Sequence, residues 1–224
     1  MIASDTLALI DIAPLRDPSP EPDALARVAR DIDAACRTLG FFRVTGHGAA
    51  PQLLATLDRE ARAFFAQPDA VKAEIEMARG GAAWRGWFPV RGELTSGRPD
   101  RKEGLYCGVD LAPDAPEVVA GLPLHGPNLY PPGGLGPAID AWMAAMRPVA
   151  EAVLRGIALG LGLPGGWFAD HLTGDPTVLF RVFHYPALPD NDVADEYGVG
   201  HHTDYGLLTL LAQDTSGGLE VETP

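Results

Sequence analysis

The sequence has few cysteines and few basic residues. It contains two cysteines among 224 residues, Cys36 and Cys107, and neither belongs to a C-x-x-C pair. This excludes a disulfide-rich scaffold, and both thiols are expected to be small buried hydrophobes in a reducing compartment. Lys and Arg total 17 against 30 Asp and Glu, which gives a net charge of −13. Binding to phosphates requires clustered basic residues, so no nucleic-acid partner is expected.

Long apolar runs and targeting signals are also missing. No stretch approaches the roughly 18 apolar residues that a membrane span needs. Residues 1–17 have no basic region and only a short apolar stretch, so no signal peptide is expected. The chain is nevertheless 46% hydrophobic, which is enough to bury a sizeable core. We therefore expect an acidic, soluble, cytoplasmic globular protein with no membrane partner, and the sequence leaves its oligomeric state open.

Three long helices are predicted in the first three quarters of the chain. Apolar residues at helical spacing predict helices over 25–39, 51–65 and 139–161, and Pro148 predicts a kink in the last of these. Short strands are predicted over 7–12 and 41–45. Between Gly80 and Pro137, glycine and proline are dense and periodicity is poor, which indicates short strands and loops that shape a site.

The last quarter has a period of two instead. It predicts strands over 177–185, 199–204, 207–212 and 218–221. Helices first and strands later are typical of an α+β protein with a mainly antiparallel sheet.

A His-x-Asp pair lies within the second of these strands. Residues i and i+2 of a strand point the same way, so His202 and Asp204 are expected to converge while His201 faces away. Nitrogen and oxygen ligands suit iron(II) or manganese better than structural zinc. Taken alone, the pair also fits a histidine hydrogen-bonded to a nearby carboxylate.

The surrounding residues add a resemblance that covers nearly the whole chain. The stretch 202–211, HTDYGLLTLL, is followed by Gln213-Asp214 and by GGLEV over 217–221. Further matching segments are LGFFRVTGHG over 39–48, Phe64-Phe65 ahead of Pro68, HGPN over 125–128 and RVFHYP over 181–186. Together these segments resemble the iron(II) and 2-oxoglutarate-dependent oxygenases, and more narrowly the isopenicillin N synthase-like group.

The resemblance implies a fold, a metal and a reaction. The fold is a double-stranded β-helix, or jelly roll, incomplete here, with an N-terminal helical region packed against it. The implied division is 5–125 as the N-terminal dioxygenase-type region, 126–174 as the long helix and connector, and 175–224 as the first part of the jelly roll. His202 and Asp204 would hold Fe(II). 2-Oxoglutarate would be the cosubstrate with O2, and a small molecule would be hydroxylated or desaturated with release of succinate and CO2.

Other site residues are also implied. In the family, a tyrosine directly before this proline helps to hold the distal carboxylate of the cosubstrate, which assigns that role to Tyr185; a half-buried aromatic at a strand end is the alternative. Arg181 and Phe183 share its strand face. Phe183 stands where many plant members have asparagine. Arg85, Trp87, Phe183 and Tyr205 are predicted to line the substrate pocket, and arginines packed over tryptophans are the alternative.

The family's remaining motifs are not found after Asp204. The chain contains no histidine beyond His202 and therefore no distal histidine followed by Arg-x-Ser. It is expected to be truncated at its C-terminus and inactive as given, and to turn over 2-oxoglutarate once the missing part is restored. The alternatives are an oxidase of the isopenicillin N synthase type, which uses no 2-oxoglutarate, and a truncated, non-catalytic binding protein. His47, His125, His171 and His184 are given no metal role.

Overall fold

A computed structural model describes residues 7–187 and 197–222, and its contacts divide the chain into two compact units. Unit 1 comprises the described residues within Met1–Ala50, Ala144–Pro176 and Gly206–Pro224. Unit 2 comprises those within Pro51–Met143 and Thr177–Tyr205. The predicted division along the chain at 125/126 and 174/175 stays a prediction.

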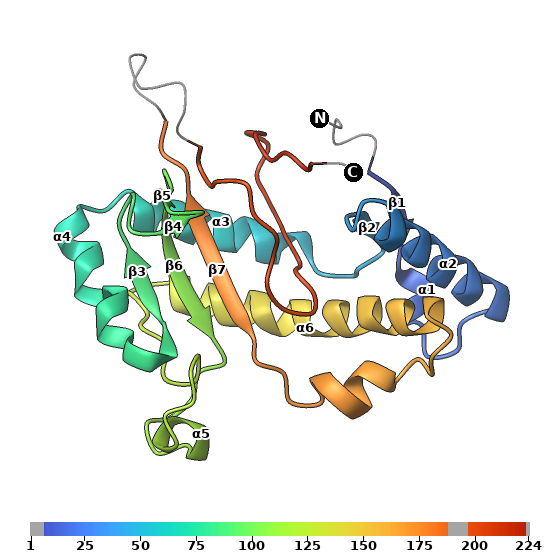
Figure 1. The fold of residues 1–224 in the computed structure, drawn as a ribbon. Helices are drawn as coiled ribbons and strands as arrows, with labels where there is room; N and C mark the ends of the chain where they lie inside the picture. The colour runs from blue at the N-terminus through green and yellow to red at the C-terminus, as the bar shows by residue number, and fades with distance from the viewer. Residues whose placement is uncertain (1–6, 188–196, 223–224) are drawn as a thin grey trace. The chain divides into compact units, whose positions relative to one another are not determined.

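Unit 1 is built around a parallel strand pair and amphipathic helices. Strands β1 (Leu9–Asp11) and β2 (Arg43–Thr45) pair in parallel (Figure 1). Its helices are α1 (Ala13–Arg16), α2 (Pro22–Thr38), the later part of α6 (Leu135–Gly160) and the π-helix η4 (Ala169–Thr173). The main core of this unit contains Ile10, Ile12, Leu15, Val28, Ile32, Ala35, Val149, Ala152 and Val153. The helices predicted over 25–39 and 139–161 are thus confirmed, and α6 remains one helix through Pro148.

Unit 2 contains several helices and a three-stranded sheet. The helices are α3 (Pro51–Phe65), α4 (Asp69–Lys72), the 3₁₀ helices η2 (Ala73–Ile75) and η3 (Met77–Ala83), α5 (Pro116–Val119) and the first part of α6. The apolar stripe of α3 is buried through Leu57, Ala61, Phe64 and Phe65, as its spacing predicts.

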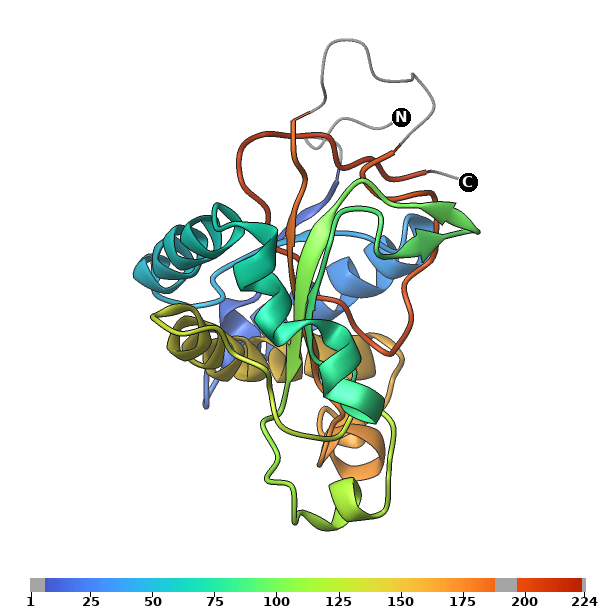
Figure 2. The ribbon, with the colours of Figure 1, turned by 90° about the vertical axis from the view of Figure 1, so that its left-hand side faces the viewer.

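The sheet of unit 2 is antiparallel, with the order β3-β6-β7 (Figure 1). Its strands are β3 (Gly86–Phe88), β6 (Glu103–Gly108) and β7 (Leu179–His184). A hairpin of β4 (Leu94–Thr95) and β5 (Arg98–Pro99) extends from the chain between β3 and β6 (Figure 2). Ser96 and Gly97 turn the hairpin with φ of 52° and 78°, the left-handed backbone that a two-residue type I′ turn requires.

The two faces of this sheet differ in composition because side chains alternate along each strand. One face packs into a core with α3 and α6 that contains Phe64, Phe65, Trp87, Leu105, Cys107 and Ile139, with Phe180 and Val182 partly buried against it. The opposite face carries Phe88, Tyr106, Arg181 and Phe183, which the register places on neighbouring strands. We call these four residues, together with Tyr185, the aromatic face.

The strands predicted over 199–204, 207–212 and 218–221 are wrong, since the described residues there carry no strand (Figure 1). A strand forms only where a neighbour pairs its N–H and C=O groups, and within the described residues β7 ends its sheet with no later strand beside it. Gly206, Gly217 and Gly218 also have φ of 90°, 80° and 92°, which interrupts extended backbone. The α+β class and the antiparallel sheet are confirmed, whereas the jelly roll stays a prediction.

Among the described residues, no helix combines the length and the apolar character needed to cross a membrane.

Candidate metal centre

His202 and Asp204 converge although their segment is not a strand. Their Nε2 and Oδ1 atoms lie 3.3 Å apart, and the two side chains are 43% and 40% exposed. Nδ1 of His202 is 2.8 Å from the carbonyl oxygen of Gly200. A carbonyl oxygen only accepts, so Nδ1 must carry the hydrogen. In the neutral imidazole the lone pair is then on Nε2, which is the ring nitrogen next to the carboxylate of Asp204.

This arrangement fits two adjacent positions on a metal ion. Two lone-pair atoms that face each other at this distance repel unless a proton or cation lies between them. Ligand bonds of about 2.1 Å at right angles place two adjacent donor atoms about 3 Å apart, close to the observed 3.3 Å. A backbone carbonyl on the other ring nitrogen is also the usual way in which a ligating histidine is oriented. In residues 7–187 and 197–222, no cluster of three His, Cys, Asp or Glu side chains could hold a metal.

Tyr185, which directly follows β7, packs against the other members of the aromatic face. Its ring lies 6.3 Å from that of Phe183, which is 6.2 Å from both Tyr106 and Phe88, in edge-to-face geometry. The Arg181 guanidinium lies 5.8 Å from the Tyr106 ring and 5.6 Å from the Phe183 ring. The predicted common face of Arg181, Phe183 and Tyr185 therefore carries one continuous set of ring and cation contacts.

Gly104 makes this packing possible. It pairs with Phe183 and with Phe88 on either side of β6. A Cβ atom at this position would lie 2.6 Å from the Phe183 ring and 2.7 Å from the Phe88 ring. Only glycine therefore lets the two rings meet over the central strand.

The phenols of this face are held in their protonated form. Partial burial raises the pKa of Tyr185, and the Asp100 and Glu93 carboxylates add to this while Arg181 opposes it. Burial likewise raises the pKa of Tyr106, which donates a short hydrogen bond to Glu93. Half of the Tyr185 side chain is exposed, so its hydroxyl can donate a hydrogen bond to a ligand across the physiological pH range.

Arg85 and Trp87, predicted to line a substrate pocket, lie in the interior at 1% and 3% exposure. Arg85 donates to the carbonyls of Ala83 at 3.0 Å and Leu124 at 2.8 Å, and burial lowers its pKa. Trp87 packs in the core and donates from Nε1 to Glu103 at 2.8 Å. As placed, neither side chain is open to a ligand. Of the other two predicted pocket residues, Phe183 belongs to the aromatic face and Tyr205 is 99% exposed.

Among the remaining histidines, His184 contacts a residue far away in the sequence, and His47, His125 and His171 contact residues close in the sequence. His184 lies on the opposite face of β7 from Tyr185, with Nδ1 2.8 Å from Glu103. His47 accepts from the amide of Ala49 at 3.2 Å within its turn. His125 and His171 contact the carbonyl oxygens of Pro123 and Trp167 at 2.8 and 2.7 Å.

Sequence reasoning overlooked a run of four charged residues, Asp100 to Glu103, all of which are buried. Lys102 pairs with Asp100 at 2.5 Å and with Glu93 at 3.1 Å, and Glu103 pairs with Lys72 at 2.6 Å. Four consecutive charges directly before a short apolar segment were the available signal, although only Glu103 lies in a strand, β6.

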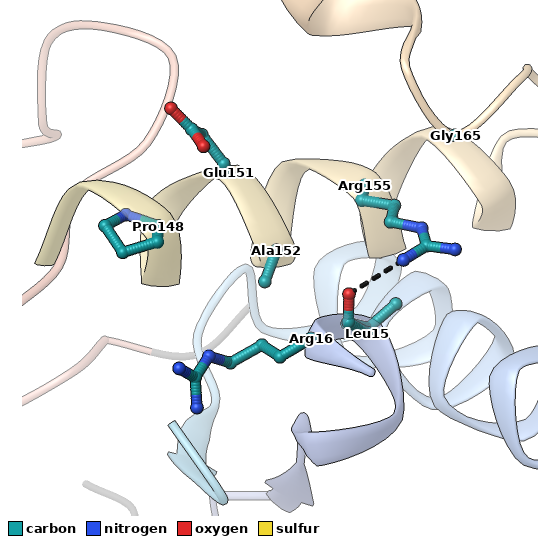
Figure 3. Close-up of a pocket in the computed structure, with 7 residues that line it drawn as sticks. All are labelled: Leu15, Arg16, Pro148, Glu151, Ala152, Arg155 and Gly165. Carbon is teal, nitrogen blue, oxygen red and sulfur yellow. Dashed lines mark hydrogen bonds between the residues drawn. The ribbon is translucent and has the colours of Figure 1, made fainter. Parts of the chain in front are cut away.

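Unit 1 contains an open cavity of about 340 Å³. Its lining residues are Leu15, Arg16, Pro148, Glu151, Ala152, Arg155 and Gly165 (Figure 3). Arg155 donates to the carbonyl oxygen of Leu15 at 2.9 Å across one side. None of the residues predicted for the metal or the cosubstrate belongs to it.

Comparison with known proteins gives matches along most of the chain. Residues 7–133 match the family described as "non-haem dioxygenase in morphine synthesis N-terminal", and residues 176–224 match the 2OG-Fe(II) oxygenase superfamily. The 2-oxoglutarate-dependent dioxygenase citB of Monascus ruber is 35% identical over 96% of this chain and 67% of its own length. A homoarginine-6-hydroxylase of Oryza sativa subsp. japonica is 36% identical over 93% of this chain and 66% of its own length.

Solved structures share the fold. A full-length Neurospora crassa protein in complex with alpha-KG superposes with a TM-score of 0.72 at 23% identity, over 92% of this chain and 64% of that one. The chain thus spans about two thirds of the length of the relatives that it matches.

Proposed function

Because the chain belongs to the 2OG-Fe(II) oxygenase superfamily, we propose that the protein is an iron(II)- and 2-oxoglutarate-dependent oxygenase that hydroxylates or desaturates a small molecule. The observation that carries the proposal is the geometry of His202 and Asp204. A nitrogen and an oxygen donor lie 3.3 Å apart, and the other ring nitrogen is bound to a carbonyl. This donor set suits a non-haem iron(II) centre with open positions.

In this proposal, Nε2 of His202 and Oδ1 of Asp204 hold the iron. When bound, the iron supplies the activation of O2, with oxidative decarboxylation of 2-oxoglutarate to succinate and CO2. The Gly200 carbonyl keeps the His202 hydrogen on Nδ1, so that Nε2 stays available as a donor atom. Asp204 supplies a negative charge that partly neutralises the cation.

Tyr185 and Arg181 are proposed to bind the anionic end of the cosubstrate. Tyr185 keeps its phenolic hydrogen because its pKa is raised, so it donates to the distal carboxylate rather than repelling it. Arg181 adds a positive charge on the same face. Phe183, which stands where many plant members carry asparagine, contributes a ring edge instead of a hydrogen bond.

A small organic substrate is supported by the matched proteins. The full-length Neurospora crassa protein is also described in complex with alpha-KG and thymine, and one relative is named for the hydroxylation of homoarginine. We propose that Tyr185 and Phe183, the two rings of the aromatic face that are not buried, take part in binding the organic substrate. The jelly roll of the superfamily is the fold proposed for residues 175–224, of which 176–224 match the 2OG-Fe(II) oxygenase family.

The test is succinate formation by the full-length gene product with iron(II), 2-oxoglutarate and O2. We expect His202→Ala and Asp204→Ala each to abolish it, and His201→Ala, which removes the neighbouring imidazole, to preserve it. Succinate formation that survives loss of both ligands would contradict the proposal. Substrate oxidation that needs iron but not 2-oxoglutarate would identify the oxidase alternative instead.

A further inference from the structure

The backbone that carries His202 is attached to the hairpin β4–β5 and the charged run that follows it. Oδ1 of Asp100 accepts from the amide of Gly200 at 3.3 Å. The amide of Arg101 donates to the carbonyl of Tyr197 at 3.2 Å, and the Ser96 hydroxyl donates to the carbonyl of His201 at 3.4 Å. Three hydrogen bonds from 96–101 thus position 197–201, which contains no strand of its own.

Asp100 is the most extensively hydrogen-bonded member of this group. Its side chain is 3% exposed, and its Oδ2 accepts from Lys102 at 2.5 Å and from Thr95 at 2.8 Å. Both of these bonds go to Oδ2, which leaves Oδ1 to accept from the amide of Gly200. Lys102 also pairs with Glu93 at 3.1 Å. The ammonium of Lys102 would therefore have an acidic partner without Asp100, and pairing with Lys102 is not the only role of the Asp100 carboxylate.

Gly200 connects Asp100 to the metal ligand. Its amide donates to Asp100, and its carbonyl accepts from Nδ1 of His202 at 2.8 Å. A Cβ atom at Gly200 would lie 3.2 and 3.3 Å from the Thr95 side chain, so the residue sits closely against the hairpin. Gly200 therefore donates a hydrogen bond to Asp100 and, through its carbonyl, orients the ring of His202.

We propose that Asp100 is a positioning residue that acts through Gly200 to hold His202 with its hydrogen on Nδ1 and its Nε2 directed at the metal position. The inference rests on the proposed function in that His202 is the ligand. Asp100 does not touch the metal. It fixes the carbonyl that selects the ring orientation of the histidine, a role of the kind that hydrogen-bond partners of metal ligands usually fill.

The test variant is Asp100→Asn. The amide keeps the size of the carboxylate, and its oxygen is expected to stay with Lys102 and Thr95, which are the stronger donors. Its NH2 group then faces the amide of Gly200. Both groups are donors, so the hydrogen bond that holds Gly200 is lost. Thr95→Val is a matched variant because it removes a bond to Oδ2 of the same carboxylate and leaves Oδ1 in place. Asp69→Asn is the control. It removes an acidic partner from another buried lysine of unit 2, Lys72, and leaves Asp100 unchanged.

The readout is the ring tautomer of His202, measured by nitrogen NMR shifts in the metal-free chain at a pH where imidazole is neutral. We expect mainly the Nδ1–H form in the wild type and a shift of about tenfold toward Nε2–H in Asp100→Asn, with no shift in Thr95→Val or Asp69→Asn. Mn(II) affinity, followed by the EPR signal of the free ion, should fall about 10- to 100-fold in Asp100→Asn alone.

An unchanged tautomer ratio in a folded Asp100→Asn would overturn the inference, and so would an equal shift in Thr95→Val. His202→Ala separates this failure from that of the proposed function. If His202→Ala leaves Mn(II) affinity unchanged, His202 is not a ligand and the proposed function fails. If only His202→Ala lowers the affinity, the role of Asp100 fails and the proposed function stands.

Discussion

Replacement of Lys72 by methionine should strongly destabilise unit 2. The Lys72 ammonium lies 2.6 Å from Glu103, and the two side chains are 4% and 5% exposed. Glu103 also accepts from Trp87 and His184, each at 2.8 Å, so it holds together α4, β3, β6 and β7. Methionine retains the apolar stem and leaves the Glu103 carboxylate buried without its cation.

The magnitude follows from this geometry. Removal of one partner of a buried ion pair costs about 3–5 kcal/mol, and the two remaining donors to Glu103 place the loss near the lower end, at about 3 kcal/mol. That is a large share of a typical unfolding free energy of about 5–15 kcal/mol. Burial alone would lower the pKa of Lys72, but its hydrogen bonds to Glu103 and Asp69 outweigh burial and raise it. The stabilisation is therefore fully present at neutral pH and is lost only as the pH rises above the ordinary lysine value.

The assay is urea unfolding monitored by tryptophan fluorescence. Asp69→Asn removes the other acidic partner of Lys72, but Asp69 is 79% exposed, so its loss should cost less than about 1 kcal/mol. The double variant Lys72→Met with Glu103→Gln should regain about 1–2 kcal/mol over Lys72→Met, because the neutral amide removes the unpaired charge and keeps an oxygen that accepts from Trp87. A Lys72→Met variant within about 1 kcal/mol of the wild type, or a double variant no more stable than the single one, would refute this account.

Three further outcomes are expected. Tyr185→Phe should weaken 2-oxoglutarate binding about tenfold, measured as a dissociation constant, while Tyr197→Phe leaves it unchanged. Because the pKa of Tyr185 is raised, its phenol should stay protonated, and the affinity for 2-oxoglutarate should not fall through phenol ionisation up to about pH 10. A loss of affinity near pH 8 would contradict the role of Tyr185 as a hydrogen-bond donor to 2-oxoglutarate. Gly104→Ala should cost about 1–3 kcal/mol in unfolding free energy, because its methyl group would enter the space of two rings; an unaltered stability would show that the rings have room.

The helices could be predicted from the sequence because their signal is local. The apolar residues of α2, α3 and α6 recur at the 3.6-residue spacing that one buried helix face requires, and the structure buries most of them. Cys36 of α2, expected to be buried, and Leu54 of α3 are exposed. His202 and Asp204 converge as predicted, although the strand from which their convergence was predicted does not form.

Pairing between distant residues could not be predicted in this way. The alternating pattern after Val199 predicts strands, but a strand depends on a partner that the pattern does not identify, and no such partner follows β7 in the described residues. Lys72 and Glu103 lie 31 residues apart, and only the fold makes them a buried pair. Arg85 and Trp87 have the composition of a binding loop, yet both are buried. Backbone carbonyls accept from the two terminal nitrogens of Arg85, and Glu103 accepts from Trp87.

The most direct test of the central claim is an anaerobic iron(II) titration of the wild type, His202→Ala, Asp204→Ala and His201→Ala. The metal assignment predicts that His202→Ala and Asp204→Ala each weaken iron(II) binding at least about tenfold, and that His201→Ala binds as the wild type does. Equal binding by the wild type and both ligand variants, or a loss confined to His201→Ala, would contradict the assignment of His202 and Asp204 as the iron ligands.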